Sequence, residues 1–388
     1  MERVVLGSER LLASGALAGR RVGVVCNPAS IDGEFRHVAD RLAAQPHVTL
    51  AALFGPQHGF RSLVQENMIE SGHETDPVRR LPVYSLYSET REPTADMLRG
   101  LDALVIDLQD VGTRVYTYIY TMANCLRAAG RAALKVIVCD RPNPIGGTLV
   151  EGPTIERGFE SFVGQYPIPM RHGMTIGEVA RLFNDHFGIG ADLDVVAMAG
   201  WRRPMHYDDT GLPWVPPSPN MPTLDTAIVY SGTVLFEGTN VSEGRGTTRP
   251  FELVGAPWIV AERFADAMNR LELPGVHCRP AAFEPTFHKH ANTSCGGCQI
   301  HVLDRQAFRP VETGVALVGA FRASDPARFA WRDPPYEYES ITLPIDILAG
   351  SPTLRAQIEQ GLAAREIARS WEAGLAGFAR LREAFLLY

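Results

Sequence analysis

Short apolar runs alternate with helical patterns through the first part of the chain. The runs predict buried strands over residues 21–27, 48–54, 81–86, 103–108 and 134–139. They are apolar throughout rather than alternating, which is typical of parallel strands covered on both faces. Helical patterns over 34–44, 93–101 and from about 114 to 129 separate them. This order predicts an α/β fold with a Rossmann-like, doubly wound parallel sheet.

The pattern changes in the second half of the chain. A helix is predicted over 174–187, where Thr175 and Glu178 have capping-box spacing, and strands are predicted over 193–198 and 228–236. Beyond these, the pattern predicts helices over 261–271, 310–321 and 363–385 and a strand over 299–303. We therefore expect two domains, residues 1–250 with the parallel sheet and a smaller α+β domain over 251–388.

Polar loops follow three of the predicted strands. They begin after Phe54, Leu108 and Cys139. In open parallel sheets, ligands bind beyond the carboxyl ends of the strands, so these loops should converge on one site.

Composition narrows the class of protein. The 388 residues carry a formal net charge of −7 without a long basic run, which argues against nucleic acid as a partner. No apolar stretch reaches the roughly 20 residues of a membrane span, so no membrane partner is expected. The first residues lack the layout of a secretory signal, which predicts a cytoplasmic location. Six cysteines in a chain of this length do not suggest a disulfide framework.

The segment Glu237–Phe251, which we call the signature loop, is the strongest candidate for chemistry. It combines Glu237, Glu243, Arg245 and Arg249 with three glycines. Glycine allows close approach of the backbone to a ligand, and arginine offers a planar fork to a carboxylate or phosphate. The loop therefore predicts a site for a small, polar, anionic molecule.

Four further candidates have both functional and structural interpretations. Asp107 and Asp110 could bind sugar hydroxyls or act as acid and base, or could be a buried acid and a helix cap. His58 could contact a ligand or fix its loop. Arg114 could hold an anion or pair with an aspartate. Glu66 and Glu70 would share one face of a helix, either as functional acids or as part of a solvated surface.

Cofactor motifs are missing from the sequence. There is no glycine-rich dinucleotide fingerprint after the first predicted strand and no Walker A sequence, so no nucleotide cofactor is expected. Cys295 and Cys298 form only one cysteine pair, which favours a glycine turn with buried thiols before a strand over a zinc site. We expect neither a metal nor an organic cofactor.

Several motifs together resemble one family. They are GPQHGF (55–60), LPVYSLYSETREPT (81–94), DLQDVGTRVYTYIYTM (107–122), DRPNPIGG (140–147), EGP (151–153), SPNMPT (218–223) and EGTNVSEGRGTTRPFELVGAPW (237–258). The chain resembles the exo-β-N-acetylmuramidase family over nearly its whole length. The resemblance implies a hydrolase that releases N-acetylmuramic acid from non-reducing ends of peptidoglycan fragments, with its site in a cleft between two domains and no cofactor.

The chain departs from the family pattern at Gln57. The usual loop is Gly-Pro-Glu-His-Gly, and its glutamate is a candidate catalytic residue, whereas Gln57 cannot transfer a proton. Glu70 is the nearest substitute in sequence and is the expected proton donor, with Asp110 and Glu243 as other candidates. Two other functions stay open, a non-catalytic protein that binds muropeptides or another anionic sugar, and a hydrolase of a different glycoside.

The remaining roles follow from the same resemblance. Asp107 and Asp110 are expected to bind hydroxyls or act as base, and His58 to orient the sugar. Arg245, with Arg114 second, is the natural partner of the lactyl carboxylate of muramic acid. The expected substrate-binding residues are Gln57, Arg114, Tyr116, Asn220, Glu237, Asn240, Glu243 and Arg245.

Overall fold

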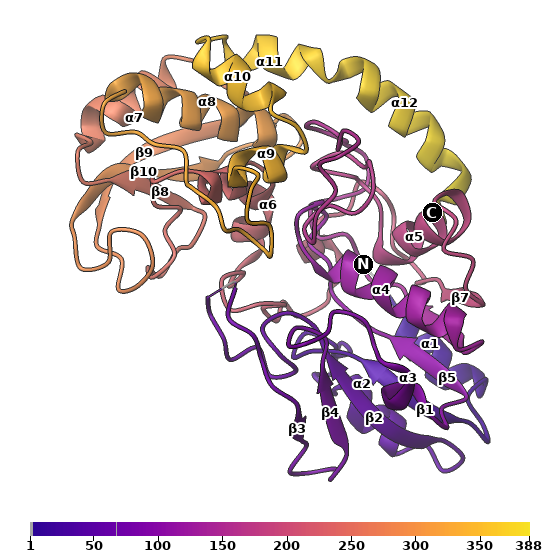
Figure 1. Cartoon of the computed structure of the whole chain (residues 1–388). Coiled ribbons are helices and arrows are strands. Elements are labelled where there is room, and N and C mark those ends of the chain that lie inside the picture. Colours follow the sequence, from indigo (N-terminus) through magenta and orange to yellow (C-terminus); the bar gives the residue numbers. More distant parts are fainter. Residues whose placement is uncertain (1–2, 67) are drawn as a thin grey trace.

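The first part of the chain forms a seven-stranded sheet. The computed structural model describes residues 3–66 and 68–388 (Figure 1). The strand order is β3-β4-β2-β1-β5-β6-β7, and every pair is parallel except β3 with β4. The strands are β1 Arg21–Val25, β2 Thr49–Gly55, β3 Glu74–Thr75, β4 Pro82–Ser85, β5 Ala103–Ile106, β6 Lys135–Cys139 and β7 Leu193–Val196. The predicted doubly wound sheet is confirmed, with its topological switch between β1 and β5.

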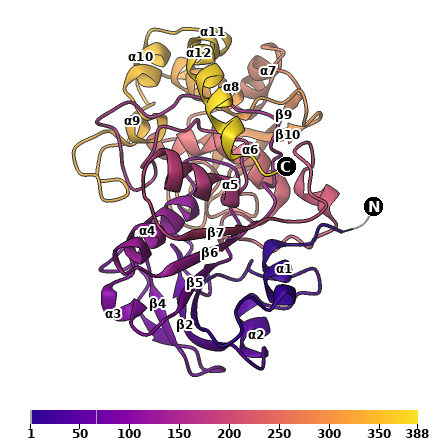
Figure 2. The same ribbon diagram turned by 90° about the vertical axis from the view of Figure 1, so that its right-hand side faces the viewer.

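Helices cover both faces of this sheet. Figure 2 shows α1 (Gly7–Ser14) and α2 (Val38–Ala43) on one side and α4 (Tyr118–Arg131) on the other. Successive residues of a strand point to opposite faces. Accordingly, Val105 packs in the cluster under α1 and α2, whereas Leu104 and Ile106 pack in the cluster under α4. The apolar runs therefore contain residues of two separate cores.

The predicted strand over 228–236 is wrong. The segment forms α6 (Leu224–Thr233) followed by the 3₁₀ helix η3 (Val234–Gly238). The side chain of Thr223 caps α6 by accepting from the backbone N–H of Thr226. Since α6 and η3 are buried nearly all round, the apolar run has no periodicity that distinguishes a helix from a strand. At Gly232 the helix touches α8 (Pro310–Ser324) so closely that a β-carbon would lie 1.8 Å from the Pro310 carbonyl oxygen.

A smaller α+β unit follows. Its antiparallel sheet has the order β8-β10-β9, with β8 Leu253–Ala256, β9 Val276–Phe283 and β10 Cys295–Val302. The sheet packs against α7 (Ala261–Asn269), which in turn packs against α8. The glycine turn predicted at Cys295–Cys298 is wrong, because these residues begin β10. Both thiols are buried, as expected. A β-carbon on Gly297 would lie 1.9 Å from the Val254 carbonyl oxygen, so the glycines permit close strand pairing.

The division expected near residue 250 would separate α6 from its packing partner α8. We propose that the division lies before α6, near residue 225.

The helix predicted over 174–187 is α5 (Ile176–Arg181) continued by the π-helical turn η1 (Leu182–His186), and the capping box at Thr175 is confirmed. The other short elements are α3 (Ala95–Leu98), η2 (Tyr207–Thr210), α9 (Pro344–Ala349) and α10 (Thr353–Glu359). Within the described chain, no helix combines the length and hydrophobicity that a membrane crossing requires.

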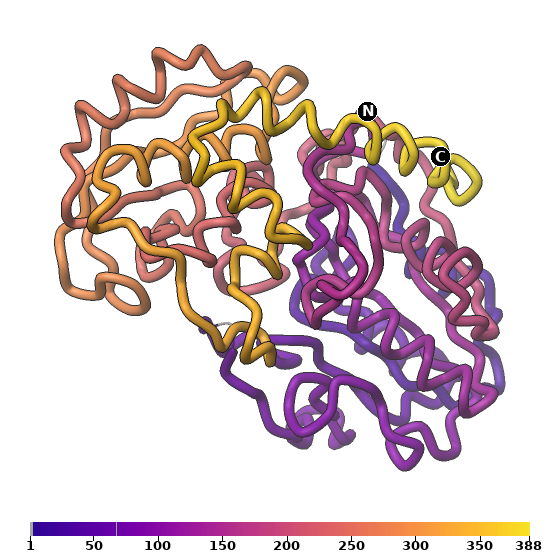
Figure 3. The backbone as a smooth tube through the Cα atoms, turned by 45° about the horizontal axis from the view of Figure 1, so that its top comes forward, coloured from indigo at the N-terminus to yellow at the C-terminus, as the bar shows by residue number. Residues whose placement is uncertain are grey.

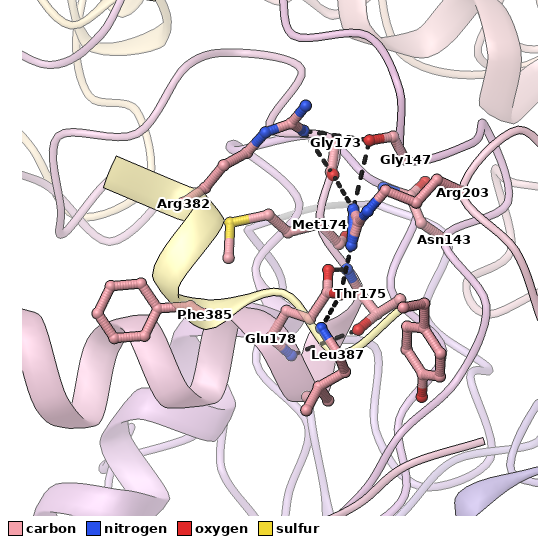
Figure 4. A network of polar contacts seen from close by, with 12 residues as sticks. Asn143, Gly147, Gly173, Met174, Thr175, Glu178, Arg203, Arg382, Phe385 and Leu387 are labelled. Atoms are coloured by element: carbon pink, nitrogen blue, oxygen red, sulfur yellow. Dashed lines mark hydrogen bonds and ion pairs between the residues drawn. The ribbon is translucent and has the colours of Figure 1, made fainter. Parts of the chain in front are cut away.

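The C-terminal helices return to the first unit. The predicted helix over 363–385 is split into α11 (Ala364–Ser370), α12 (Glu372–Arg382) and η4 (Glu383–Phe385). Figure 3 shows this last segment crossing from the second unit to the first. There, Arg382 donates to the carbonyl oxygens of Gly147 and Gly173 at 3.1 and 2.8 Å, and the Leu387 N–H donates to Glu178 at 2.8 Å (Figure 4). The segment therefore ties the two units together.

Replacing Arg382 by alanine should destabilise the protein. The variant removes the charged donor of the His172 and Thr148 carbonyl oxygens and one of the two charged donors of the Gly147 and Gly173 oxygens, to which Arg203 also donates. Hydrogen bonds to charged groups contribute about 1.5–3 kcal/mol. Urea denaturation should show a free energy of unfolding lower by about this amount. The exposed Arg380 on the same helix provides the control, and its alanine variant should stay near the wild type. Equal stability of the two variants would contradict the bridging role.

Candidate active site

A pocket lies where the two units meet. It encloses about 470 Å³ of empty space and receives residues from both units. The first unit contributes the loop after β2 and the segment before α4, at the carboxyl edge of the sheet. The second unit contributes α6, the signature loop and a turn near residue 337. The lining consists of Gln57, His58, Val115, Tyr116, Thr117, Tyr118, Val163, Ser218, Asn220, Met221, Tyr230, Glu237, Arg245, Phe251, Tyr336 and Glu337.

Glu237 is held in a defined orientation at one wall of this pocket. Nη2 of Arg245 donates to its Oε1 at 2.6 Å, and the hydroxyl of Tyr336 donates to its Oε2 at 2.6 Å. All three side chains are buried. A buried carboxylate with a cationic partner and a hydroxyl donor is suited to face a polar ligand without rearrangement.

Arg245, which lines the pocket, keeps donor capacity beyond this pair. Burial disfavours its charged form, but Glu237 and Glu243 raise the pKa of Arg245 above its usual value. Its Nη1 is buried without a hydrogen-bond partner among residues 3–66 and 68–388. Buried donors are nearly always satisfied in folded proteins, so Nη1 is a candidate donor to a ligand oxygen.

Glu243 lies behind Arg245 and does not line the pocket. Lys289 Nζ donates to its Oε2 at 2.6 Å, and His288 Nδ1 lies 3.3 Å from its Oε1. Burial opposes ionisation, but Lys289 first, then His288 and Arg245, hold the pKa of Glu243 well below its usual range. Glu243 therefore anchors the signature loop as a permanent carboxylate.

Glu337 lies in the pocket as a second buried acid. Gln57 Nε2 donates to its Oε1 at 3.2 Å, and the hydroxyl of Tyr87 donates to its Oε2 at 2.9 Å. Burial, with a further contribution from the Glu237 charge, raises the pKa of Glu337 to about 7. A carboxyl group that keeps its proton near neutral pH can act as a general acid.

The backbone around Glu337 is strained. Tyr336 and Glu339 exchange two backbone hydrogen bonds, at 2.8 and 2.9 Å, and enclose a two-residue turn. Its central residues, Glu337 and Tyr338, have φ angles of 45° and 70°, in the left-handed region that favours glycine. Such conformations cost about 1–3 kcal/mol and accumulate at functional sites. Here the turn places the Glu337 carboxyl group in the pocket.

Gln57 and His58 lie beside this acid. The Thr117 hydroxyl donates to Gln57 Oε1 at 2.7 Å, which directs the amide nitrogen toward Glu337. Nδ1 of His58 donates to the Val64 carbonyl oxygen at 2.7 Å. Burial lowers the pKa of His58 to about 4, so its ring is neutral at pH 7 and Nε2 is an acceptor. A neutral histidine can receive a hydrogen bond from a sugar hydroxyl.

Comparison with known proteins decides the family. The model of the N-terminal part of exo-β-N-acetylmuramidase NamZ matches residues 22–225, and that of its C-terminal part matches residues 228–388. The chain belongs to the NamZ family. The peptidoglycan β-N-acetylmuramidase NamZ of Bacillus subtilis (strain 168) is 48% identical over 372 residues, which cover 96% of this chain and 88% of that protein.

Solved structures of the NamZ family's fold support the assignment. A DUF1343 family protein from Bacteroides fragilis aligns over 100% of this chain and 99% of its own, with a TM-score of 0.89 and 35% identity. A second such protein from the same organism aligns over the same shares, with a TM-score of 0.77 and 28% identity. The two-unit architecture is therefore that of the DUF1343 proteins.

Several residues that the NamZ resemblance suggested are not part of the pocket lining. Asp107 is fully buried and pairs with Arg141, whose Nε lies 2.6 Å from its Oδ1. Asp110 accepts from the backbone N–H of Gly112 at 2.7 Å. Arg114 donates to carbonyl oxygens in three distant segments and ties them together. These contacts favour structural roles for the three residues over the hydroxyl-binding and anion-binding roles expected of them.

Asn240 and Glu70 also lie outside the lining. The Asn240 side chain donates to the Arg328 carbonyl oxygen at 2.7 Å and accepts from the Ala330 N–H at 3.0 Å. Glu70 is half exposed and pairs with Arg91 at 2.8 Å. The helix considered for Glu66 and Glu70 is not formed, since residues 66 and 68–70 are not helical and residue 67 lies outside the described residues. We therefore withdraw Glu70 as the expected proton donor.

Glu70 is nevertheless close to the turn that carries the buried acid. The guanidinium of its partner Arg91 lies 3.8 Å from the centre of the Tyr338 ring.

The expected residues that do meet in the pocket are Gln57, His58, Tyr116, Asn220, Glu237 and Arg245. Glu337 is not among the residues predicted from the sequence, because nothing in PPYEYES (334–340) distinguishes this glutamate from its neighbours.

Proposed function

We propose that this protein is an exo-acting glycoside hydrolase that releases N-acetylmuramic acid from the non-reducing ends of peptidoglycan fragments, a reaction of cell-wall recycling. The observation that carries the proposal is the buried acid Glu337, which keeps its proton near pH 7 in the same pocket as Glu237. The activity of the Bacillus subtilis relative supports the choice of substrate.

Glu337 is the proposed proton donor to the glycosidic oxygen. Glycoside hydrolysis passes through a transition state with positive charge on the sugar ring, and it usually employs two carboxyl groups. Glu237, held by Arg245 and Tyr336, is the second carboxylate and stabilises this charge. Gln57 donates a hydrogen bond to Glu337 and orients it, so this chain needs no carboxylate at position 57.

Arg245 is the proposed partner of the lactyl carboxylate. Its Nη2 is bound to Glu237, while its Nη1 is the unpaired buried donor in the pocket wall. A charged hydrogen bond from Nη1 to the lactyl group would distinguish N-acetylmuramic acid from N-acetylglucosamine, which lacks that group. His58 and Asn220 complete the set of polar groups around the sugar.

Gln57 also favours a second candidate, a protein that binds muropeptides without cleaving them. In that case Glu337 would be a buried acid without a catalytic role. The presence of a protonated carboxyl group beside an ionic carboxylate favours the hydrolase, because binding alone does not require this costly arrangement.

The test compares two chromogenic substrates, a β-N-acetylmuramide and the matching β-N-acetylglucosaminide. We expect release of the chromophore from the muramide and little from the glucosaminide. Binding of N-acetylmuramic acid without release from either substrate would identify the protein as a binding protein. Release from the glucosaminide alone would establish a different glycosidase.

A further inference from the structure

A second cavity adjoins the pocket of Glu237 and Glu337, and we call it the outer groove. It encloses about 1220 Å³ of space, more than twice that of the inner pocket. Its walls come from the proline-rich segment near residue 220, the signature loop and the loop after β9. The lining consists of Gln65, Pro219, Asn220, Pro222, Gly246, Thr247, Thr248, Pro250, Leu253, Ala282, Phe283, Glu284, Thr286 and Phe287.

The signature loop divides the two cavities. Arg245 and Phe251 line the inner pocket, whereas their chain neighbours Gly246 and Pro250 line the outer groove. Asn220 lines both cavities. A ligand that extends from the inner pocket past Asn220 would therefore enter the outer groove.

The loop after β9 is held against the signature loop at Gly246. The Thr286 N–H donates to the Gly246 carbonyl oxygen at 2.9 Å, and the Thr286 hydroxyl donates to the same oxygen at 3.0 Å. Gly246 has a φ of 80°, and a β-carbon there would lie 2.7 Å from the Phe287 carbonyl oxygen. The groove wall is thus built by backbone contacts that the glycine permits.

Two phenylalanine rings in this wall lie outside the hydrophobic clusters. Phe283 and Phe287 are half-buried, and neither belongs to the clusters formed by the described residues. Thr247, Thr248 and Thr286 also line the groove, and Glu284 is the one charged residue in its lining. Apolar rings among a few polar groups are typical of a ligand site.

We propose that the outer groove binds the neutral sugar on the reducing side of the cleaved bond, an N-acetylglucosamine residue in peptidoglycan. The inference rests on the proposed function, which places N-acetylmuramic acid in the inner pocket. The apolar face of a pyranose ring packs on Phe287, and its hydroxyls face the threonines. Glu284 disfavours an anionic residue at this position, because like charges repel.

The test uses two substrates that share the muramyl group. One is the disaccharide N-acetylmuramyl-β-1,4-N-acetylglucosamine, and the other is β-N-acetylmuramyl fluoride, whose leaving group is a single atom and does not reach the groove. Phe287→Ala should lower kcat/KM about tenfold on the disaccharide and less than twofold on the fluoride. Phe287→Trp should restore activity on the disaccharide. Phe35→Ala, which removes an exposed ring elsewhere, should change neither value.

An equal change on both substrates, or no change on either, would overturn the groove assignment while leaving the hydrolase intact. If the wild type cleaves neither substrate, the proposed function fails and calorimetry tests the groove. The disaccharide should then bind more tightly than N-acetylmuramic acid, and Phe287→Ala should abolish the difference. An unchanged difference in the variant would overturn the proposal.

Discussion

Replacing Glu337 by glutamine should lower kcat on the chromogenic muramide by about 10²–10⁴-fold, the usual contribution of a general acid. Glutamine keeps the size of the side chain and can still bond to Tyr87 and Gln57, so the fold should persist. Hydrolysis of β-N-acetylmuramyl fluoride should fall much less, because fluoride leaves without full protonation. Steady-state kinetics on both substrates measures the two effects.

The pH dependence provides an independent check on Glu337. Since the pKa of Glu337 is about 7, kcat/KM of the wild type should decline as the pH rises through 7, and the variant should lack this decline. Glu339→Gln is the matched control, because Glu339 belongs to the same turn and does not line the pocket. More than a tenth of wild-type kcat on the chromogenic muramide, with the decline intact, would remove Glu337 from the mechanism.

The same acid should couple stability to pH. Its pKa is raised on folding, so protonated Glu337 contributes stability below its unfolded pKa of about 4.5, and this contribution is lost as the pH rises through 7. Asp140 and Glu151 are also buried, with pKa values of about 7, and they add the same loss of stability with rising pH in the wild type and in Glu337→Gln. The wild type should therefore lose more of its free energy of unfolding between pH 4.5 and 7 than Glu337→Gln does.

Replacing Arg245 by lysine should weaken recognition of the lactyl group. Lysine keeps a cation near Glu237 and Glu243, so neither carboxylate is left buried without a partner. Lysine has no counterpart of the unpaired Nη1 donor of Arg245. A charged hydrogen bond contributes about 1.5–3 kcal/mol, so affinity for N-acetylmuramic acid should fall by roughly 10–150-fold.

Calorimetric titration with both sugars measures this effect. Affinity for N-acetylglucosamine should change little, because it has no lactyl group. Arg249→Lys is the control, since Arg249 lies in the same loop, is exposed and pairs with Glu252. Equal losses for the two sugars would show that Arg245 supports the pocket in general and does not read the lactyl carboxylate.

These expectations share one structural cause. The parallel sheet positions Gln57 and Thr117, whereas Glu237, Arg245 and Glu337 come from the second unit. Catalysis in this pocket therefore requires a fixed relation between the units. The C-terminal segment, anchored through Arg382 and Leu387, is one of the contacts that maintain it.

The sequence by itself determined the doubly wound sheet and much of the site. Strand and helix periodicity is local, so apolar runs such as those in β1 and β5 were readable without tertiary information. The signature loop was also readable, because its charges and glycines lie close together in the chain. Glu237 and Arg245 were identified on this basis. His58 was identified from its own tight loop, and the resemblance to the family added Gln57, Tyr116 and Asn220.

The tertiary structure alone decided the partners of the charged groups. Asp107 and Arg114 are residue types that often occur in binding sites. In the folded protein, Asp107 pairs with Arg141, and Arg114 donates to carbonyl oxygens of distant segments. No local sequence pattern reveals these partners. Burial on all sides likewise concealed the helix α6 in a run that resembles a strand.

The place of Glu337 in the pocket, beside Gln57, depends most on tertiary structure. Glu337 lies 280 residues away in the chain and reaches the pocket through a strained turn. Its raised pKa arises from burial between the two units, a property of the assembled fold that no local sequence pattern contains.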